Sequence, residues 1–252
     1  MSQEPIRHRS TIESLATILA VALFAPGGVD AQTVAESGVE APGVHQLILP
    51  GTDRRYTLAI PKDYSREDPA PLIVSLHYGG RVTPFFGRGL LESLIEPAFR
   101  ELNAIVVAPD SAAGNWANPT SEQQVLELLD YIDAHYEIDA NKTLLTGYSM
   151  GGSGTWYLAP RHPDRFKAAL VMAGRPQGDT LTFEWTTPLY VIHSAEDEVA
   201  PLGPTQATVD RLVDSAVPVR LVIADGITHY EIPRYRSYLA DAIPWIRQVW
   251  GE

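Results

Sequence analysis

The stretch from Thr143 to Gly154 constrains the fold of this chain more than any other. A short apolar, β-branched run leads into the pattern Gly147-x-Ser149-x-Gly151, and a helix-compatible segment follows. A serine at the apex of a sharp strand-to-helix turn leaves no room for side chains two residues before or after it, so glycines are needed there. The pattern therefore predicts a strand, a tight turn and a helix, with the Ser149 hydroxyl held above the edge of a sheet.

The predicted turn also presents a backbone amide. The N–H of Met150, at the start of the helix, is expected to face a negatively charged oxygen that develops beside Ser149, and the helix dipole would strengthen that attraction. Glycine-flanked serines also occur in ordinary loops. The interpretation therefore depends on the strand before the serine and the helix after it.

Strand-like and helix-like segments alternate along the chain. Besides the strand before Ser149, apolar runs predict strands at residues 45–49, 55–60, 71–77, 104–108, 166–173, 188–193 and 217–224, the first two as an antiparallel hairpin. Helical spacing predicts helices at residues 90–102, 121–135, 205–215 and 235–250. Ser121 and Gln124 are expected to form a capping box at the start of the helix at residues 121–135. Pro244 is expected to kink the helix at residues 235–250.

This alternation predicts an α/β protein. We expect a mostly parallel, twisted sheet of about eight strands with helices on both faces, and functional loops at the carboxyl ends of the strands. The short stretch at residues 174–188 leaves no space for a large lid domain.

The N-terminus has the pattern of a targeting segment. Arg7 and Arg9 precede an apolar run at residues 15–26, and Ala31 ends a triplet that suits signal-peptide cleavage. The run is shorter than the roughly 20 residues that span a bilayer, so no stable membrane anchor is expected. We divide the chain into a signal peptide (1–31), a linker (32–43) and one catalytic domain (44–252), and expect a secreted or periplasmic protein.

Composition excludes several classes of function. With 45% hydrophobic and 20% charged residues, the chain is an ordinary globular protein. Its net charge of -12 and lack of a basic cluster argue against binding to nucleic acid. It has no cysteine, which excludes disulfides and a thiol nucleophile. The oligomeric state is not predicted.

A serine hydroxyl needs an imidazole to take its proton and a carboxylate to orient that imidazole. Both should lie on loops after later strands, in the order serine, acid, histidine. The loop after residues 188–193 offers three adjacent carboxylates. Asp197 is preferred because it lies four residues past His193 and is followed by Val199-x-Pro201, the usual setting of the acid in a fold of this kind. Glu196 and Glu198 are then expected to be solvated loop charges.

The loop after residues 217–224 contains His229, which is the expected base. A structural or surface role is expected for the other six histidines, which are His8, His45, His77, His135, His162 and His193.

Several motifs now combine. They are Tyr56-x-Leu58-x-x-Pro61, Leu76-His77-Tyr78-Gly79-Gly80, Gly147-Tyr148-Ser149-Met150-Gly151-Gly152, His193-Ser194-x-x-Asp197 and His229. In this order the chain resembles the α/β-hydrolase superfamily over about residues 44–250. Within it, the chain is similar to secreted esterases of the feruloyl-esterase and polyhydroxyalkanoate-depolymerase type.

The resemblance implies a role for each matching residue. Ser149 would be the nucleophile, His229 the general base and later acid, and Asp197 its orienting carboxylate, without a metal or organic cofactor. The N–H groups of Met150 and Gly79 would hold the oxyanion. Tyr78 stands where relatives often have glycine, which leaves open whether Tyr78 or Gly79 gives the second N–H; Ser194 also replaces a frequent glycine.

Aromatic residues near these motifs are candidates for the substrate pocket. Trp116, in the loop at residues 114–119, either lines the pocket or packs beneath its own loop. Tyr148 and Tyr230, the chain neighbours of Ser149 and His229, are further pocket candidates. Trp156, on the helix after Ser149, is expected in the core.

The resemblance implies a serine carboxylesterase that acts on short-chain, aryl (feruloyl-type) or polymeric esters through an acyl-enzyme. One alternative is a serine peptidase of the same fold, although such peptidases usually carry an extra domain for which residues 44–252 leave no room. The other alternative is a binding module without activity. Such modules usually lose a residue of the triad or a glycine of the turn, and here all are present.

Overall fold

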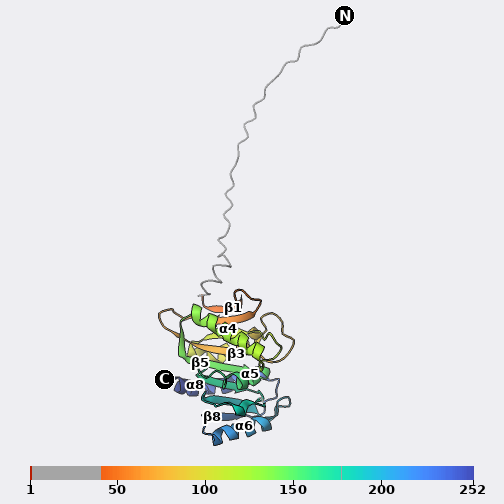
Figure 1. Cartoon of the computed structure of the whole chain (residues 1–252), viewed down its shortest axis with the longest axis vertical. Helices are drawn as coiled ribbons and strands as arrows, with labels where there is room; N and C mark the ends of the chain where they lie inside the picture. Colours follow the sequence, from red (N-terminus) through yellow and green to blue (C-terminus); the bar gives the residue numbers. More distant parts are fainter. Residues whose placement is uncertain (2–40, 177) are drawn as a thin grey trace.

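The structure is a computed structural model that describes Met1 and residues 41–176 and 178–252 (Figure 1). The predicted signal peptide, its cleavage site after Ala31 and most of the predicted linker lie outside the described residues, so they stay predictions. Among the described residues, no helix is both long and apolar enough to cross a membrane.

Eight strands form one sheet in the order β1-β2-β4-β3-β5-β6-β7-β8. β1 and β2 form the predicted antiparallel hairpin, and β2 is also antiparallel to β4. The remaining neighbours pair in parallel, which confirms the predicted sheet. The strands are β1 (Gly43–Ile48), β2 (Arg55–Ile60), β3 (Ala70–Leu76), β4 (Ile105–Pro109), β5 (Ile138–Tyr148), β6 (Ala168–Met172), β7 (Leu189–Ser194) and β8 (Val219–Ala224).

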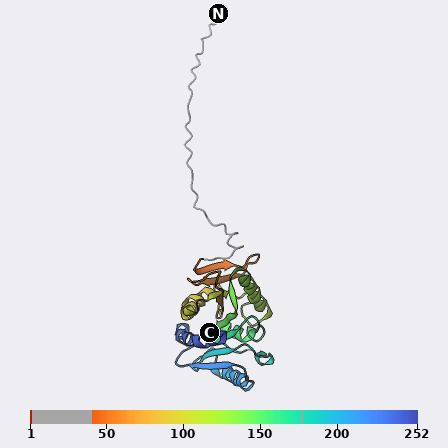
Figure 2. The same cartoon turned by 90° about the vertical axis from the view of Figure 1, so that its left-hand side faces the viewer.

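Helices cover both faces of the sheet, as predicted. One face packs against α4 (Pro119–His135), α5 (Met150–Leu158) and α6 (Leu202–Asp214). The other packs against α2 (Gly87–Leu90), α3 (Glu96–Phe99), α7 (Tyr235–Asp241) and α8 (Ile243–Trp250). Figure 2 shows the β1–β2 hairpin, in orange, at one end of this layered arrangement. Short turns of other helix types occur at Leu91–Ile95 (π) and at Arg100–Leu102, Thr180–Thr182 and Ile232–Arg234 (3-10).

The central strand β3 shows why the sequence folds this way. Leu72, Val74 and Leu76 point to the face covered by α4 and α5, while Ile73 points to the face covered by α2 and α3. All four are at most 1% exposed. Because successive strand residues alternate between faces, only a continuous apolar run can fill both cores. Burial of each such side chain contributes about 1.5–3 kcal/mol.

Helix α4 begins differently from the prediction. It starts at Pro119, and the Asn118 side chain caps it by accepting from the Ser121 N–H at 3.0 Å. The predicted capping box of Ser121 and Gln124 is therefore wrong. Proline at the first helical position fixes the start two residues earlier. Gln124 instead contacts the loop after β4, where its amide donates to the Asp110 carbonyl at 2.6 Å.

The last helical segment is two helices. α7 ends at Asp241 and α8 begins at Ile243, with Pro244 in the first turn of α8. Proline has no N–H to donate to a preceding turn, so it is tolerated at a helix start and interrupts a continuous helix. The predicted kink at Pro244 is thus a full break just before it.

Candidate active site

The predicted turn at Ser149 is present. β5 ends at Tyr148 and α5 begins at Met150, so the chain reverses at Ser149, whose φ is 55° and ψ is -114°. A residue other than glycine seldom adopts such a backbone conformation, and this kind of backbone strain is typical of turns at functional sites. A Cβ on Gly151 would lie 1.9 Å from the Leu76 carbonyl oxygen, and one on Gly147 would lie 2.3 Å from the Gly151 oxygen. The two glycines are therefore sterically required.

The structure brings together the three residues predicted to carry the chemistry. Ser149, Asp197 and His229 follow β5, β7 and β8, whose carboxyl ends lie at the same edge of the sheet. The Ser149 Oγ lies 2.8 Å from the His229 Nε2. The His229 Nδ1 lies 2.9 Å from Asp197 Oδ1 and 2.8 Å from Oδ2. With its proton on Nδ1, His229 donates to the carboxylate and its Nε2 is free to accept from the serine hydroxyl.

The Asp197 side chain is fully buried, so its charge needs several donors. The backbone N–H groups of Val199 and Ala200 donate to its Oδ1 at 3.0 and 2.6 Å. The turn at residues 197–200 folds back on the carboxylate and holds it. The residues that follow Asp197 therefore supply the hydrogen-bond donors that its buried carboxylate needs.

The loop after β3 lies beside the start of α5. A Cβ placed on Gly79 would be 3.7 Å from the Met150 Cβ, so these two backbones approach closely. Gly79 is exposed, whereas Tyr78 is half-buried and its ring packs edge-on against Phe86 at 5.5 Å. The structure thus brings Gly79 and Met150 to the same corner of the sheet edge. Their service as oxyanion donors stays a prediction.

His77 has the structural role expected for it. Its Nδ1 donates to the Tyr78 carbonyl at 2.7 Å, and its Nε2 accepts from the Ser111 N–H at 3.0 Å. Such a pair of bonds requires a neutral ring protonated on Nδ1. Burial lowers the pKa of His77, in agreement with a neutral ring. His77 thus ties the loop after β3 to the loop after β4.

Stability is expected to fall with acid because two histidines are buried in neutral form. Burial lowers the pKa of both His77 and His193 below the ordinary value of 6.5. The unfolded chain therefore binds protons more readily, and the free energy of unfolding should decrease as pH falls below about 6.5, by up to about 1.4 kcal/mol per pH unit for each histidine. Urea unfolding at pH 7.5 and 5.5 measures this.

A His193→Gln variant is the control for this prediction. The His193 Nε2 donates to the Ala200 carbonyl at 2.6 Å, a bond that a glutamine amide can replace without titrating. The variant should show a shallower loss of stability between the two pH values. An equal or higher free energy of unfolding of the parent at pH 5.5 would contradict the prediction.

Two of the predicted pocket residues are not pocket walls. Trp116 is 0% exposed, packs its Cβ against Gly154 and donates from Nε1 to the His77 carbonyl at 2.9 Å, so it packs beneath its own loop. Tyr148 is 1% exposed, and its hydroxyl donates to the His229 carbonyl at 2.5 Å. Both side chains are buried and bonded inside the protein, so neither can contact a substrate. Trp156 is fully buried, which confirms its core position.

Tyr230 is the predicted pocket residue that remains accessible. Its side chain is 74% exposed, and its ring centroid lies 5.6 Å from that of His229 in an edge-on arrangement. An exposed aromatic face beside His229 is available to a bound molecule.

Glu196 and Glu198 are exposed loop residues, as predicted, but each also accepts a backbone hydrogen bond that was not predicted. Glu198 accepts from the His229 N–H at 3.0 Å and Glu196 from the Gly226 N–H at 3.1 Å. Ser194, which replaces a frequent glycine, donates to Glu196 at 3.0 Å and orients it. The acidic run beside Asp197 is visible in the sequence. Which N–H donates to each carboxylate depends on how the loop after β7 packs against the loop after β8.

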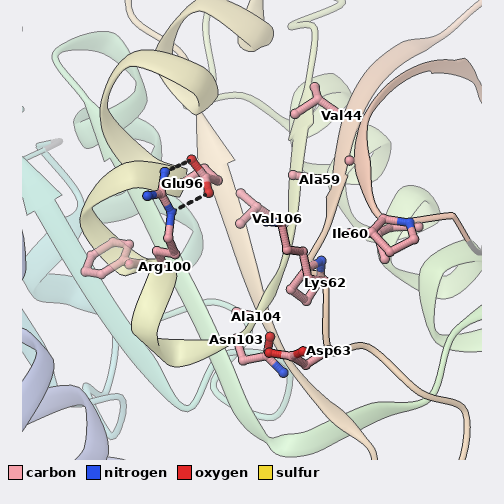
Figure 3. Close-up of a pocket in the computed structure, with 14 residues that line it drawn as sticks. Val44, Ala59, Ile60, Lys62, Asp63, Glu96, Arg100, Asn103, Ala104 and Val106 are labelled. Atoms are coloured by element: carbon pink, nitrogen blue, oxygen red, sulfur yellow. Dashed lines mark hydrogen bonds and ion pairs between the residues drawn. The ribbon is translucent and has the colours of Figure 1, made fainter.

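A cavity of about 590 Å³ lies outside this site (Figure 3). It is lined by the start of β1, the end of β2 and the region from α3 to β4, including Val44, Ile60 and Val106. These positions are at the amino end of the parallel strands, opposite Ser149. Neither there nor elsewhere in the described part of the chain do three or more His, Asp or Glu side chains gather in a group able to hold a metal ion.

Part of the chain that includes Ser149 matches a known protein family. Residues 49–187, more than half of the chain, match the model of the family named Esterase. The chain belongs to the Esterase family. The matched stretch of this esterase-family chain runs from before β2 to just before β7, so it includes Gly79 and Ser149. Asp197 and His229 lie beyond it.

Individual proteins show the same relationship. The chain is 29% identical over 171 residues to a protein of Aspergillus niger named "Probable feruloyl esterase C", and the alignment covers 63% of this chain and 59% of that protein. The chain thus spans less than two thirds of this relative.

Solved structures confirm the α/β-hydrolase fold. A thermostable esterase superposes with a TM-score of 0.69 at 22% identity, covering 86% of this chain and 64% of that one. MGS-M1, described as an α/β-hydrolase enzyme from a Medee basin deep-sea metagenome library, superposes with a TM-score of 0.64 at 16% identity, covering 83% of this chain and 98% of that one.

Proposed function

We propose that this chain is a serine carboxylesterase that works through Ser149, His229 and Asp197. The observation that carries the proposal is the pair of hydrogen bonds on His229, with Nε2 at 2.8 Å from the Ser149 Oγ and Nδ1 at 2.8 Å from Asp197. This is the arrangement that lets an imidazole remove a serine proton. Membership of the Esterase family supports an ester as the bond that is cleaved.

In the first step, the Ser149 Oγ attacks the ester carbonyl carbon while its proton passes to the His229 Nε2. The imidazolium that forms is stabilised by Asp197, which lies on the opposite side of the ring. The tetrahedral intermediate then expels the alcohol, which takes the proton from Nε2. An ester now joins the acyl group to Ser149.

In the second step, a water molecule gives a proton to the His229 Nε2 and attacks the acyl carbon. Collapse of this second intermediate releases the carboxylic acid and returns the proton to the Ser149 Oγ. The proposed oxyanion donors are the N–H of Met150 at the start of α5 and that of Gly79 or Tyr78 in the loop after β3. The close approach of Gly79 to Met150 favours Gly79 as the partner of Met150.

The proposed substrates are short-chain, aryl or polymeric esters. Tyr230 is largely exposed beside His229, and the connection from β6 to β7 contains only a short 3-10 turn, Thr180–Thr182, among its described residues. Both features favour an open site, which a bulky or polymeric ester can reach. The similarity to the Aspergillus niger protein named "Probable feruloyl esterase C" favours an aryl acyl group.

Replacement of Tyr230 by alanine is expected to weaken the binding of aryl esters. An aromatic contact contributes about 0.5–1.5 kcal/mol beyond the buried area, so KM for methyl ferulate should rise about two- to tenfold with little change in kcat. Steady-state kinetics of the parent and of Tyr230→Ala and Tyr230→Phe measure this. Tyr230→Phe keeps the ring and should match the parent; an equal KM for Tyr230→Ala would show that the exposed ring does not bind the aryl group.

A substrate panel tests the proposed function against its rivals. The parent protein is assayed on p-nitrophenyl esters of rising chain length, on methyl ferulate and on a p-nitroanilide. Turnover of the esters with little turnover of the anilide is the expected result. Cleavage of the anilide alone would favour a serine peptidase, and no turnover of any compound would favour a binding module.

A further inference from the structure

The main chain of His229 is held on both sides, by a side chain at the end of β5 and by one from the loop after β7. Its N–H donates to the Glu198 Oε2 at 3.0 Å, and its carbonyl oxygen accepts from the Tyr148 hydroxyl at 2.5 Å. These bonds are additional to the two that the imidazole makes with Ser149 and Asp197. All four polar groups of this residue therefore have a partner.

The origin of the two main-chain partners is informative. Tyr148 directly precedes Ser149, and Glu198 directly follows Asp197. The end of β5 with its turn and the loop after β7 therefore each contact His229 twice, once through a side chain that bonds the imidazole and once through a neighbouring side chain that bonds the backbone. We propose that Tyr148 and Glu198 are positioning residues that fix the backbone of His229 and so keep its Nε2 in reach of Ser149. This inference rests on the proposed function.

Tyr148 is suited to this task because it cannot move or ionise easily. The ring is 1% exposed and packs edge-on against Tyr235 at a centroid distance of 5.2 Å. Burial raises the pKa of Tyr148, so the phenol stays protonated and donates. Its side chain leaves the strand that carries Ser149, so its hydroxyl ties the histidine loop directly to the nucleophile turn.

Glu198 acts on a loop that other carboxylates also hold. Glu196 accepts from the Gly226 N–H at 3.1 Å, and Glu231 accepts from the Thr228 N–H at 2.8 Å. These two bonds hold residues ahead of His229, whereas Glu198 holds His229 itself. Glu198 is exposed, so its removal leaves no cavity in the core. A loss of activity in a Glu198 variant can therefore be separated from a loss of folding.

The chemistry explains why backbone position matters. During the proposed reaction the imidazole takes a proton from Ser149 and gives it to the leaving alcohol, and both transfers need a short, aligned hydrogen bond. A displacement of about 1 Å can cost roughly 100-fold in rate. Asp197 restrains only the ring, which can still tilt if the backbone shifts. The Tyr148 and Glu198 bonds remove that freedom.

The test compares Glu198→Ala, Glu198→Gln and Tyr148→Phe with the parent. The control is Glu67→Ala, which replaces an exposed glutamate in the segment before β3, at the amino end of the parallel strands. We measure kcat and KM on p-nitrophenyl acetate, the rate at which a fluorophosphonate labels Ser149, and the melting temperature. Glu198→Ala and Tyr148→Phe should lower both kcat and the labelling rate about tenfold, with KM and the melting temperature of Glu198→Ala nearly unchanged. Glu198→Gln keeps an acceptor oxygen and should recover most of the lost rate.

Equal labelling rates for the parent, Glu198→Ala and Tyr148→Phe would overturn the inference. So would a loss in Glu198→Ala that Glu198→Gln does not recover, because a lost negative charge, rather than a lost acceptor, would then be the cause. A parent that is labelled at Ser149 but hydrolyses no ester would reject the proposed function alone. The labelling rates of the variants would still decide whether Tyr148 and Glu198 position His229.

Discussion

Replacement of Ser149 by alanine is expected to lower kcat for ester hydrolysis by about 10⁵-fold or more, because the attacking oxygen is removed. The backbone N–H groups near Gly79 and Met150 would remain, so a small residual rate above that of water is expected. The fold should survive, since Ser149 is only half-buried and alanine removes a single oxygen. Hydrolysis of p-nitrophenyl acetate by parent and variant measures the effect.

The matched control for this prediction is Ser215→Ala. Ser215 is an exposed serine at the end of α6, far along the chain from the nucleophile turn, and its replacement should leave kcat within about twofold of the parent. A Ser149→Ala variant that keeps more than a hundredth of the parent rate would show that another group attacks the ester.

Replacement of Asp197 by asparagine is expected to lower kcat about 10⁴-fold through the tautomer of His229. The N–H groups of Val199 and Ala200 donate to the carboxylate, so an asparagine there would turn its oxygen toward them and its NH₂ toward the His229 Nδ1. The imidazole would then carry its proton on Nε2 and could no longer accept the proton of Ser149.

Asp197→Asn changes neither volume nor shape, so its melting temperature should stay close to that of the parent. Asp214→Asn, at an exposed position of α6, is the matched control and should keep full activity. Comparable kcat values for Asp197→Asn and the parent would mean that the carboxylate does not set the tautomer. An unchanged kcat would lead to this conclusion even if KM or the melting temperature of Asp197→Asn fell.

Much of the fold could be predicted because local signals and long-range packing agree. The continuous apolar run of β3 fits a strand buried on both faces, and Leu72, Ile73 and Val74 fill both cores. The turn at Ser149 could be predicted because only glycine avoids a collision at residues 147 and 151. The meeting of Asp197 and His229 beside Ser149 could be predicted because parallel strands end at one edge of the sheet. The order along the chain left three adjacent carboxylates, and only the spacing from His193 and the following Val199-x-Pro201 favoured Asp197 among them.

The missed features depend on how distant segments meet. Trp116 is an aromatic residue in a loop, and only the missing side chain of Gly154 creates the space that buries it; a Cβ there would lie 2.3 Å from the Trp116 Cβ. Glu198 lies 31 residues from the histidine whose N–H it accepts. No periodicity or spacing in the sequence predicts this contact between Glu198 and His229. The start of α4 was missed because Asn118 and Ser121 are both good caps, and the following proline decides between them.

The proposed mechanism requires that Ser149 becomes covalently bonded during turnover. The most direct measurement is to treat the parent and Ser149→Ala with a fluorophosphonate and to locate the adduct by peptide mapping and mass spectrometry. We predict one adduct per chain, on the Ser149 oxygen, with parallel loss of ester hydrolysis, and no adduct on Ser149→Ala. An adduct on another residue, or full hydrolysis by a parent that takes up no label, would contradict the proposed role of Ser149 as the nucleophile.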